Sequence, residues 1–475
     1  MSIQEMTNPT RLESDSIGNK SVPVDAYYGV QSLRAVENFD ITGLRMRREM
    51  INSLALLKKA CAIANREAGA LEPAIANAIV AACDEICEGK YHDQFIVDPI
   101  QGGAGTSMNM NANEVIANIA VQKLGGELGD YKLVHPNDHV NCGQSTNDIV
   151  PTAGKMTTLV LLQSLEKSLQ GLYESFRRKE KEFDSIIKMG RTQLQDAVPV
   201  RLGQEFGAYA TAVKRGMDRI HKTWSEMYAV NIGGTAIGTG INADREYFDH
   251  VTQKLAELTG FPFCQAADMI DATQNIDGFA AVSSAVKDCS LALSKIANDL
   301  RLMSSGPRTG FGEINLPAKQ NGSSIMPGKV NPVIPEVVNQ VAFRIMGNDV
   351  TVAMAVEAGQ FELNAFEPVV FEALFQSIKM LDRAAQTFTV NCVDGITANE
   401  ERCNELLDAS VGIITALCPY IGYTQAASLA KEALKKRIPV RTLLIERNII
   451  SAEEAERILN VYSMTQPGVP GKEEN

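Results

Sequence analysis

The sequence predicts a mainly α-helical protein organised around a bundle of long helices. Two separated segments carry apolar residues at alternating spacings of three and four, which places each set on one stripe of a helix. The first stripe is Leu162, Leu165, Leu169, Leu172 and Phe176. The second is Val282, Val286, Cys289, Leu293, Ile296, Leu300 and Met303. Short local partners cannot bury stripes of this length, so we expect several long helices that pack against one another.

The other elements follow from local composition. Residues 1–48 carry Pro, Gly and turn residues around short apolar pieces, which indicates an irregular or partly stranded entry. Helical periodicity begins at Ile51. The segments 199–228 and 333–390 are rich in Ala, Val, Leu, Met and Glu, so we expect four or five long helices in a central unit. Helix faces this apolar commonly continue across a subunit boundary, which favours a homo-oligomer.

The C-terminal part of the chain is predicted to form shorter helices than the central part. From about residue 402, short helical pieces are interrupted by Pro419, Gly422 and Pro439, which indicates a small separate helical unit. We therefore expect three domains: a mixed, mostly helical domain over 1–146, a long-helix domain over 147–401, and a small helical domain over 402–475.

Net charge restricts the possible partners. The chain has 45 Lys and Arg against 57 Asp and Glu, a formal charge of −12. A surface of this sign repels phosphate backbones and anionic membranes, so we expect neither a nucleic acid nor a membrane as partner. No uncharged apolar stretch is long enough to span a bilayer, and Met1-Ser2-Ile3-Gln4-Glu5 lacks the features of a leader. The expectation is a soluble protein without a targeting segment.

Cysteine usage points to a reducing compartment. The nine cysteines are scattered, odd in number and without a Cys-x-x-Cys pair, so we expect reduced thiols in a cytoplasmic protein. Cys83 and Cys87 lie one helical turn apart, but no His or Asp completes a metal-ligand set nearby. We expect no metal site.

Two polar, glycine-rich stretches precede predicted helices. In the first, Gly102–Asn111, glycines let the backbone approach a ligand and Thr106 is the expected N-cap. The second, Gly143–Asp148, lies just before a long helix expected to begin near Val150. Both stretches also fit ordinary helix capping. Helix N-termini with free N–H groups and hydroxyls bind carboxylates well, so both also suit an anionic substrate.

Two further stretches carry polar side chains between glycines. One is Gly190–Ala197, and the other is Gly322–Pro332, where two glycines and two prolines surround two serines, a lysine and an asparagine. That composition is typical of a hinged loop that presents polar groups to a ligand. A plain surface linker would not need the apolar residues Ile325, Met326 and Val330.

The stretch Gly322–Pro332 closely resembles the signature loop of the aspartase/fumarase superfamily. The other three stretches are similar to the remaining conserved regions of this superfamily, in the same order and spacing, and the likeness runs almost end to end. Within the superfamily, Ser145–Asp148, Gly190–Ala197 and Pro332–Val341 are similar to the branch that acts on L-aspartate. This resemblance implies a three-domain fold and a homotetramer with a twenty-helix core, in which three subunits build each active site.

The resemblance also implies a reaction. Ammonia would be eliminated reversibly from L-aspartate to give fumarate, through an aci-carboxylate intermediate and with no organic cofactor. Ser323 would be the base. The developing aci-carboxylate would be held by Thr106, Ser145, Thr146 and Ser324, the other carboxylate by Lys329 and Asn331, and the amino group by Asn147, Thr192 and Gln193.

The nearest alternative is a class II fumarase, which has a similar loop and fold. Fumarases place a His after the Thr of the third stretch and pair it with a Glu that resembles Glu336. Here Gln193 cannot titrate, which disfavours hydration chemistry. His135 and His139 lie close to the second stretch, where structural or secondary-site roles are at least as probable as catalytic ones.

Two other classes fit less well. Ammonia-lyases with an internal electrophile need an Ala-Ser-Gly triad, and Ser304-Ser305-Gly306-Pro307 differs from it. A helical scaffold without activity would explain the bundle but not the polar loops, although fold alone does not determine function.

Overall fold

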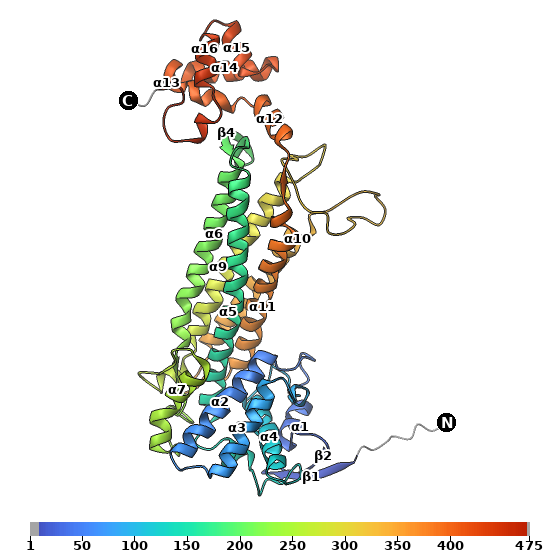
Figure 1. The fold of residues 1–475 in the computed structure, drawn as a ribbon, viewed down its shortest axis with the longest axis vertical. Coiled ribbons are helices and arrows are strands. Elements are labelled where there is room, and N and C mark those ends of the chain that lie inside the picture. The colour runs from blue at the N-terminus through green and yellow to red at the C-terminus, as the bar shows by residue number, and fades with distance from the viewer. Residues whose placement is uncertain (1–8, 473–475) are drawn as a thin grey trace, which may run out of the picture. The chain divides into compact units, whose positions relative to one another are not determined.

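The computed structural model describes residues 9–472 (Figure 1). The residues Met1–Glu5, on which the expectation of an absent leader rests, lie outside this range. The chain divides into two compact units, both discontinuous in sequence. The first unit comprises Met1–Glu166, Asp218–Asp288 and Phe343–Leu381, and the second comprises Lys167–Met217, Cys289–Ala342 and Asp382–Asn475. The division into 1–146, 147–401 and 402–475 stays a prediction.

Five long helices dominate the structure, which confirms the mainly α-helical class (Figure 1). Their bounds are α5 Thr146–Glu182, α6 Leu202–Lys222, α9 Asp277–Met303, α10 Val333–Glu357 and α11 Glu367–Asn391. Every side chain of the two predicted apolar stripes is at most 6% exposed. The periodicity of α5 and α9 therefore located their buried faces correctly.

Aromatic contacts hold these helices together within each unit. In the second unit, the ring of Phe176 on α5 contacts Phe206 on α6 and Phe388 on α11, with centroid distances of 6.1 and 6.2 Å. In the first unit, Phe279 on α9 meets Phe371 on α11 at 5.2 Å. Such pairs add about 0.5–1.5 kcal/mol each to the free energy gained by burying their area.

The first unit also contains shorter elements. Helix α4 is buried all round, since each residue from Met108 to Val121 is buried, and the pairs α2–α3 and α2–α7 pack closely. The elements are β1 Thr10–Asp15, β2 Gly18–Pro23, α1 Val30–Asn38, α2 Arg48–Glu67, α3 Pro73–Cys87, a 3₁₀ turn His92–Gln94, α4 Thr106–Lys123, a π-helical turn Pro136–Val140, a 3₁₀ turn Thr223–Met227, β5 Ala229–Val230, α7 Arg245–Thr259, β6 Cys264–Gln265 and α8 Asp271–Gln274.

The second unit contains the expected short C-terminal helices, with their own apolar cluster around Leu417, Leu443 and Leu444. Pro439 is the N-cap of α15, where a missing N–H costs nothing. The elements are β3 Ile187–Thr192, β4 Gln195–Arg201, β7 Ile314–Asn315, a 3₁₀ turn Val393–Gly395, β8 Thr397–Ala398, α12 Glu400–Ala409, a 3₁₀ turn Gly412–Leu417, α13 Cys418–Ile421, α14 Tyr423–Lys436, α15 Val440–Glu446, α16 Ala452–Ile458 and a 3₁₀ turn Ser463–Thr465.

One predicted helical segment begins later in the structure than the sequence indicated. Residues 199–201 belong to strand β4, which pairs with β3, so the helix predicted over 199–228 begins only at Leu202. The segment 333–390 holds the two long helices α10 and α11. Helix α10 ends at Glu357. Beyond it, Nδ2 of Asn364 donates to the carbonyl oxygens of Ala355 (2.9 Å) and Val356 (3.1 Å), which satisfies two acceptors of the last turn.

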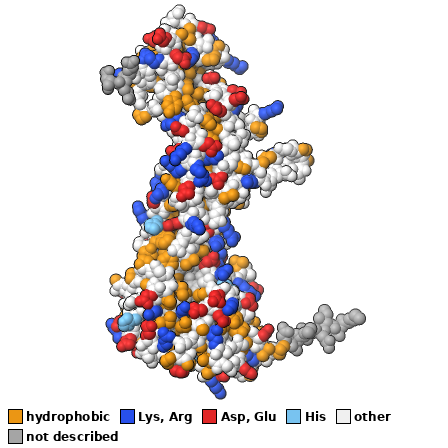
Figure 2. Space-filling view, in the orientation of Figure 1, with side chains coloured by type: hydrophobic (Ala, Val, Ile, Leu, Met, Phe, Trp, Pro, Cys, Tyr) orange, Lys and Arg blue, Asp and Glu red, His pale blue; other side chains and the backbone are white. Residues whose placement is uncertain are grey.

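Charged side chains of both signs are interspersed on the visible face of the molecule (Figure 2). None of the helices within residues 9–472 is long and apolar enough to cross a lipid bilayer.

Candidate active site

The four polar stretches fall into two groups, one in each unit. Gly102–Asn111 and Gly143–Asp148 belong to the first unit, and Gly190–Ala197 and Gly322–Pro332 belong to the second. Each group is held in place by its own hydrogen bonds.

Ser145 and Asp148 cap the start of α5 reciprocally. The hydroxyl of Ser145 accepts from the N–H of Asn147 (3.2 Å), and one carboxylate oxygen of Asp148 accepts from the N–H of Ser145 (2.9 Å). The other oxygen of Asp148 accepts from the N–H groups of Gly233 (3.1 Å) and Thr235 (3.0 Å). Burial raises the pKa of Asp148 to about 7. The buried carboxyl group of Asp148 thus fixes the predicted substrate-binding turn in place.

The second stretch rests on a buried polar network. The Oδ1 of Asn141 accepts from Nζ of Lys58 (2.8 Å) and from the Nδ2 atoms of Asn109 (3.3 Å) and Asn113 (3.2 Å). Asn109 also donates to Oγ1 of Thr146 (3.3 Å), which connects the two stretches of this unit. The network is only partly satisfied, since the Oδ1 atoms of Asn109 and Asn113 have no hydrogen-bond partner among the described residues.

Sequence reasoning missed Lys58, although a signal was present. This lysine is 0% exposed and lies on the apolar face of α2, between the buried residues Leu54 and Cys61. Burial lowers its pKa to about 8. A lysine at such a core position needs oxygen partners, and the side chains of Asn141 and Gln144 supply them, each at 2.8 Å from Nζ.

The expectation that Thr106 is the N-cap of α4 was wrong. The N-cap is Gly105, and the hydroxyl of Thr106 donates to the carbonyl oxygen of Gly103 (2.7 Å) instead of accepting from the helix. The side chain of Gln101 accepts from the N–H of Met108 in the first turn of α4 (2.9 Å). Gly105 has φ of +83°, and a Cβ there would lie 2.7 Å from the side chain of Val150. The glycine therefore lets the start of α4 lie directly against the first turns of α5.

Thr106, Ser145, Thr146 and Asn147 are consequently brought together at the adjoining starts of α4 and α5. The amide of Asn147 is already used, since its Nδ2 donates to the carbonyl oxygen of Ala236 (2.7 Å).

In the second unit, Thr192 and Gln193 lie at the tip of the β3–β4 hairpin. Gln193 and Leu194 both have positive φ, 54° and 61°, which is the geometry of a tight hairpin turn. Both Thr192 and Gln193 are exposed. Gly190 is required just before them, because a Cβ there would lie 2.7 Å from the carbonyl oxygen of Val198.

Hydrogen bonds join the two ends of the Gly322–Pro332 loop, and most of the residues between these ends are exposed. The N–H of Gly322 donates to the carbonyl oxygen of Lys329 (2.8 Å), and Nδ2 of Asn331 donates to the carbonyl oxygen of Gly322 (2.7 Å). Ile325 is 84% exposed. The loop therefore has a defined base and a tip without tertiary packing, as a mobile substrate-covering loop requires.

Within this loop, Ser323 occupies a distinctive position. Its Oγ accepts from the backbone N–H groups of Ile325 (3.2 Å) and Met326 (2.9 Å). Two N–H groups directed at one hydroxyl oxygen favour the negative charge of an alkoxide. Ser324 and Lys329 are exposed on the same loop.

A cavity of about 830 Å³ adjoins the loop in the second unit. It is lined by Lys329 and Asn331 together with Arg301, Ser304 and Glu336. Nη2 of Arg301 lies 3.8 Å from Oε1 of Glu336. Glu336 therefore has a permanently charged arginine as its neighbour.

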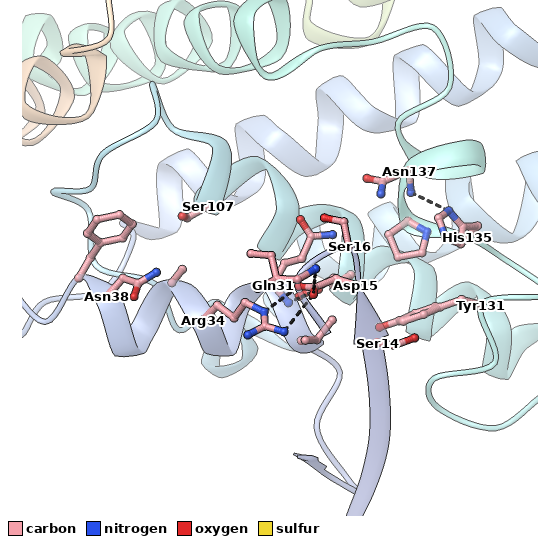
Figure 3. Close-up of a pocket in the computed structure, with 16 residues that line it drawn as sticks. Ser14, Asp15, Ser16, Gln31, Arg34, Asn38, Ser107, Tyr131, His135 and Asn137 are labelled. Atoms are coloured by element: carbon pink, nitrogen blue, oxygen red, sulfur yellow. Dashed lines mark hydrogen bonds and ion pairs between the residues drawn. The ribbon is translucent and has the colours of Figure 1, made fainter. Parts of the chain in front are cut away.

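A second cavity, of about 490 Å³, lies in the first unit (Figure 3). Asp15 and Arg34 form an ion pair at 2.8 Å in its wall, and His135 and Asn137 contribute from the π-helical turn. Nδ1 of His135 accepts from the N–H of Asn137 (3.2 Å), and Nδ1 of His139 accepts from the N–H of His135 (2.9 Å). Both histidines thus accept backbone hydrogen bonds within this turn.

Within residues 9–472, no group of three or more His, Cys, Asp or Glu side chains is arranged to hold a metal ion.

Comparison with known proteins identifies the family. A model described as "Lyase" matches residues 18–347, and one described as "Fumarase C C-terminus" matches residues 413–466. The aspartate ammonia-lyase of Bacillus subtilis (strain 168) is 54% identical over 463 residues, which cover 98% of both chains. That of Escherichia coli (strain K12) is 47% identical over 470 residues, again 98% of both.

Solved structures of related proteins also match this chain over nearly its whole length. The fumarate lyase:delta crystallin from Brucella melitensis bound to cobalt has a TM-score of 0.94 at 46% identity and covers 97% of this chain and 100% of its own. The class II fumarase from Schistosoma mansoni has a TM-score of 0.92 at 34% identity, over 96% and 99%. The predicted resemblance is confirmed, and the chain belongs to the aspartase/fumarase superfamily of lyases.

Proposed function

We propose that this protein catalyses the reversible elimination of ammonia from L-aspartate to give fumarate. The relatives that are 47–54% identical over nearly the whole chain are named aspartate ammonia-lyases. The structural observation that carries the proposal is the position of Ser323, whose Oγ accepts two backbone N–H groups inside a loop whose two ends are joined by hydrogen bonds.

In the proposed reaction, Ser323 removes a proton from the carbon beside the side-chain carboxylate of the substrate. This proton is a very weak acid, so the base must be activated and the product charge must be stabilised. The two N–H groups at Ser323 favour its alkoxide, and Lys329 supplies a positive charge on the same loop. Electrons from the broken C–H bond move onto the carboxylate as an aci-carboxylate dianion, which then expels ammonia.

The dianion requires hydroxyl and N–H donors. We assign this role to Thr106, Ser145, Thr146 and Ser324, and losing one such donor typically costs about 3 kcal/mol of transition-state stabilisation. Thr106 is the first residue of α4, and the N-terminus of a helix favours a bound anion, which supports the assignment.

The two ends of the substrate are distinguished by different groups. Lys329 and Asn331 clamp the second carboxylate, with charge-assisted hydrogen bonds. Asn147, Thr192 and Gln193 orient the amino group. This chemistry needs no organic cofactor.

We further propose that the active protein is a homotetramer in which different subunits complete each site. Helix α10 presents the large apolar side chains of Phe343, Val350 and Met354 at 61%, 59% and 65% exposure. Their spacing places them on one face of the helix, and an apolar helix face of this kind is normally covered by a partner. A neighbouring copy of the bundle would cover it.

The proposed compartment is the cytoplasm. None of the nine cysteines, all of which lie within the described residues, forms a disulfide, and Cys264 is exposed, which fits a reducing environment.

A fumarase activity is the alternative, since the class II fumarase from Schistosoma mansoni shares the fold. Expelling hydroxide from malate requires a strong acid near the leaving group, whereas an ammonium group already carries its proton. Gln193 cannot supply a proton.

The test is the ultraviolet absorbance of fumarate after addition of L-aspartate or L-malate to the purified protein. We expect rapid fumarate formation from L-aspartate and none above background from L-malate. Comparable rates on both substrates would restore the fumarase interpretation, and no fumarate from L-aspartate would refute the proposal.

A further inference from the structure

A fully buried carboxylate lies behind the hairpin that carries Thr192 and Gln193. Glu313 is 0% exposed. Its Oε1 accepts from Nη1 of Arg191 at 2.8 Å, and its Oε2 lies 3.2 Å from Nζ of Lys188, which is itself only 3% exposed. A buried charge is tolerated only when counter-charges lie close to it. Glu313 therefore holds two residues of β3 to one point in the interior of the unit.

The geometry of β3 is adapted to this arrangement. In a regular strand, positions 188 and 191 would point to opposite faces, because side chains alternate. The pairing of β3 with β4 shifts register between Met189 and Arg191. Such a bulge re-aims the side chains that follow it, which allows Lys188 and Arg191 to reach the same carboxylate.

The segment that provides Glu313 is fixed at its backbone. The N–H of Glu313 donates to the carbonyl oxygen of Met303 (2.8 Å), and its carbonyl oxygen accepts from the N–H of Asn399 (2.9 Å). The ring of Phe311 lies 4.3 Å from Cζ of Arg191. Arg191 is thus held from two sides by residues 311–313, and this same segment leads through β7 into the Gly322–Pro332 loop.

We infer that Glu313 is a positioning residue for catalysis: through Arg191 it sets where the Thr192–Gln193 turn lies. The inference rests on the proposed function, in which this turn orients the substrate amino group. Arg191 directly precedes Thr192, so a displaced guanidinium moves the turn. Displacements of about 1 Å can lower a rate by about 10²-fold.

Glu205 offers a matched control. It is the second carboxylate beside Lys188, at 3.1 Å, and it makes no ion pair with Arg191 among the described residues. Glu313→Gln and Glu205→Gln remove the same charge and keep the same volume, but only Glu313→Gln removes the counter-charge of Arg191.

Kinetics on L-aspartate give the first test. We expect kcat/KM to fall by about 10²-fold in Glu313→Gln and to stay close to wild type in Glu205→Gln. In a background of Gln193→Ala, Glu313→Gln should cause a smaller further loss, because one of the groups it positions is already absent. An equal fold loss in both backgrounds would overturn the inference.

Amide hydrogen exchange gives a second test that does not depend on the reaction. Residues 190–197 should exchange faster in Glu313→Gln than in wild type and Glu205→Gln. If L-aspartate is not a substrate, the proposed function fails but this measurement still decides the positioning role. Unchanged exchange at these residues would overturn it.

Should Glu313→Gln not fold, Glu313→Asp keeps the charge but shortens the reach. Amide hydrogen exchange at residues 190–197 should then be faster in Glu313→Asp than in wild type, and equal exchange rates would overturn the inference.

Discussion

The hydroxyl oxygen of Ser323 lies 2.9 Å from the backbone nitrogen of Met326 and accepts its hydrogen bond. The bond closes a tight turn inside the Gly322–Pro332 loop, so the loop itself stabilises negative charge on the residue proposed as the base.

Ser323→Ala should leave the protein folded and assembled but nearly abolish turnover, because it removes the proposed base and little packing. Fumarate formation from L-aspartate, with assembly checked by light scattering, measures this. Ser225→Ala is the control, since Ser225 is an exposed serine that bonds only locally, to the carbonyl oxygen of Lys222. More than about a tenth of the wild-type rate in Ser323→Ala would exclude this serine as the sole base.

Lys329→Ala should weaken binding of the non-reactive dicarboxylate succinate by about tenfold or more, because one carboxylate loses a charge-assisted hydrogen bond. Calorimetric titration of succinate gives the affinity. Lys319→Ala removes an equally exposed lysine that lies before the loop, and it should bind succinate as the wild type does. Equal affinity of Lys329→Ala and wild type would contradict the clamp.

Mixing two inactive variants tests whether different subunits complete each site. After subunit exchange, Ser323→Ala with Thr192→Ala should regain partial activity, because some sites receive an intact loop and an intact hairpin from different chains. The control mixture, Ser323→Ala with Lys329→Ala, should stay inactive, since every chain then carries a defective loop. If exchange is confirmed and the first mixture remains inactive, the sites lie within single chains.

Asp98 should contribute stability that depends on pH. Burial alone would raise its pKa, but hydrogen bonds from Ile100 and Thr42 outweigh burial and lower its pKa below the usual 3.8. Its carboxylate accepts from the N–H groups of Thr42 (2.7 Å) and Ile100 (2.8 Å). A lowered pKa means that the stabilisation is complete above the unfolded pKa and is lost as pH falls through the folded pKa.

We therefore expect Asp98→Asn to lower the free energy of unfolding by about 2 kcal/mol at pH 7, with the difference shrinking at pH values below about 4. Urea unfolding at several pH values measures it. Asp93→Asn removes an exposed carboxylate nearby and should change stability little. A difference between wild type and Asp98→Asn that stays constant down to pH 2 would refute the assignment.

The sequence by itself determined the long helices, the polar stretches and the family. The stripes of α5 and α9 were readable because helix periodicity is a local property, set by the backbone geometry of neighbouring residues. The four stretches were readable because glycines and hydroxyl residues gather wherever backbone and ligand approach each other. The roles of Ser323, Lys329 and Gln193 remain predictions from that pattern.

Only the tertiary structure decided where single polar groups point. Thr106 was a reasonable N-cap by residue type, but its hydroxyl donates to Gly103, and no sequence pattern distinguishes a donor from an acceptor role for a hydroxyl. Residues 199–201 form a strand rather than a helix start because β4 finds its partner in β3, and strand pairing depends on the partner as much as on local propensity. The local sequence around Glu313 carries no pattern that singles it out. Its importance arises from Arg191 and Lys188, which lie far away in sequence, because the energy of a buried charge is set by the groups that surround it in space.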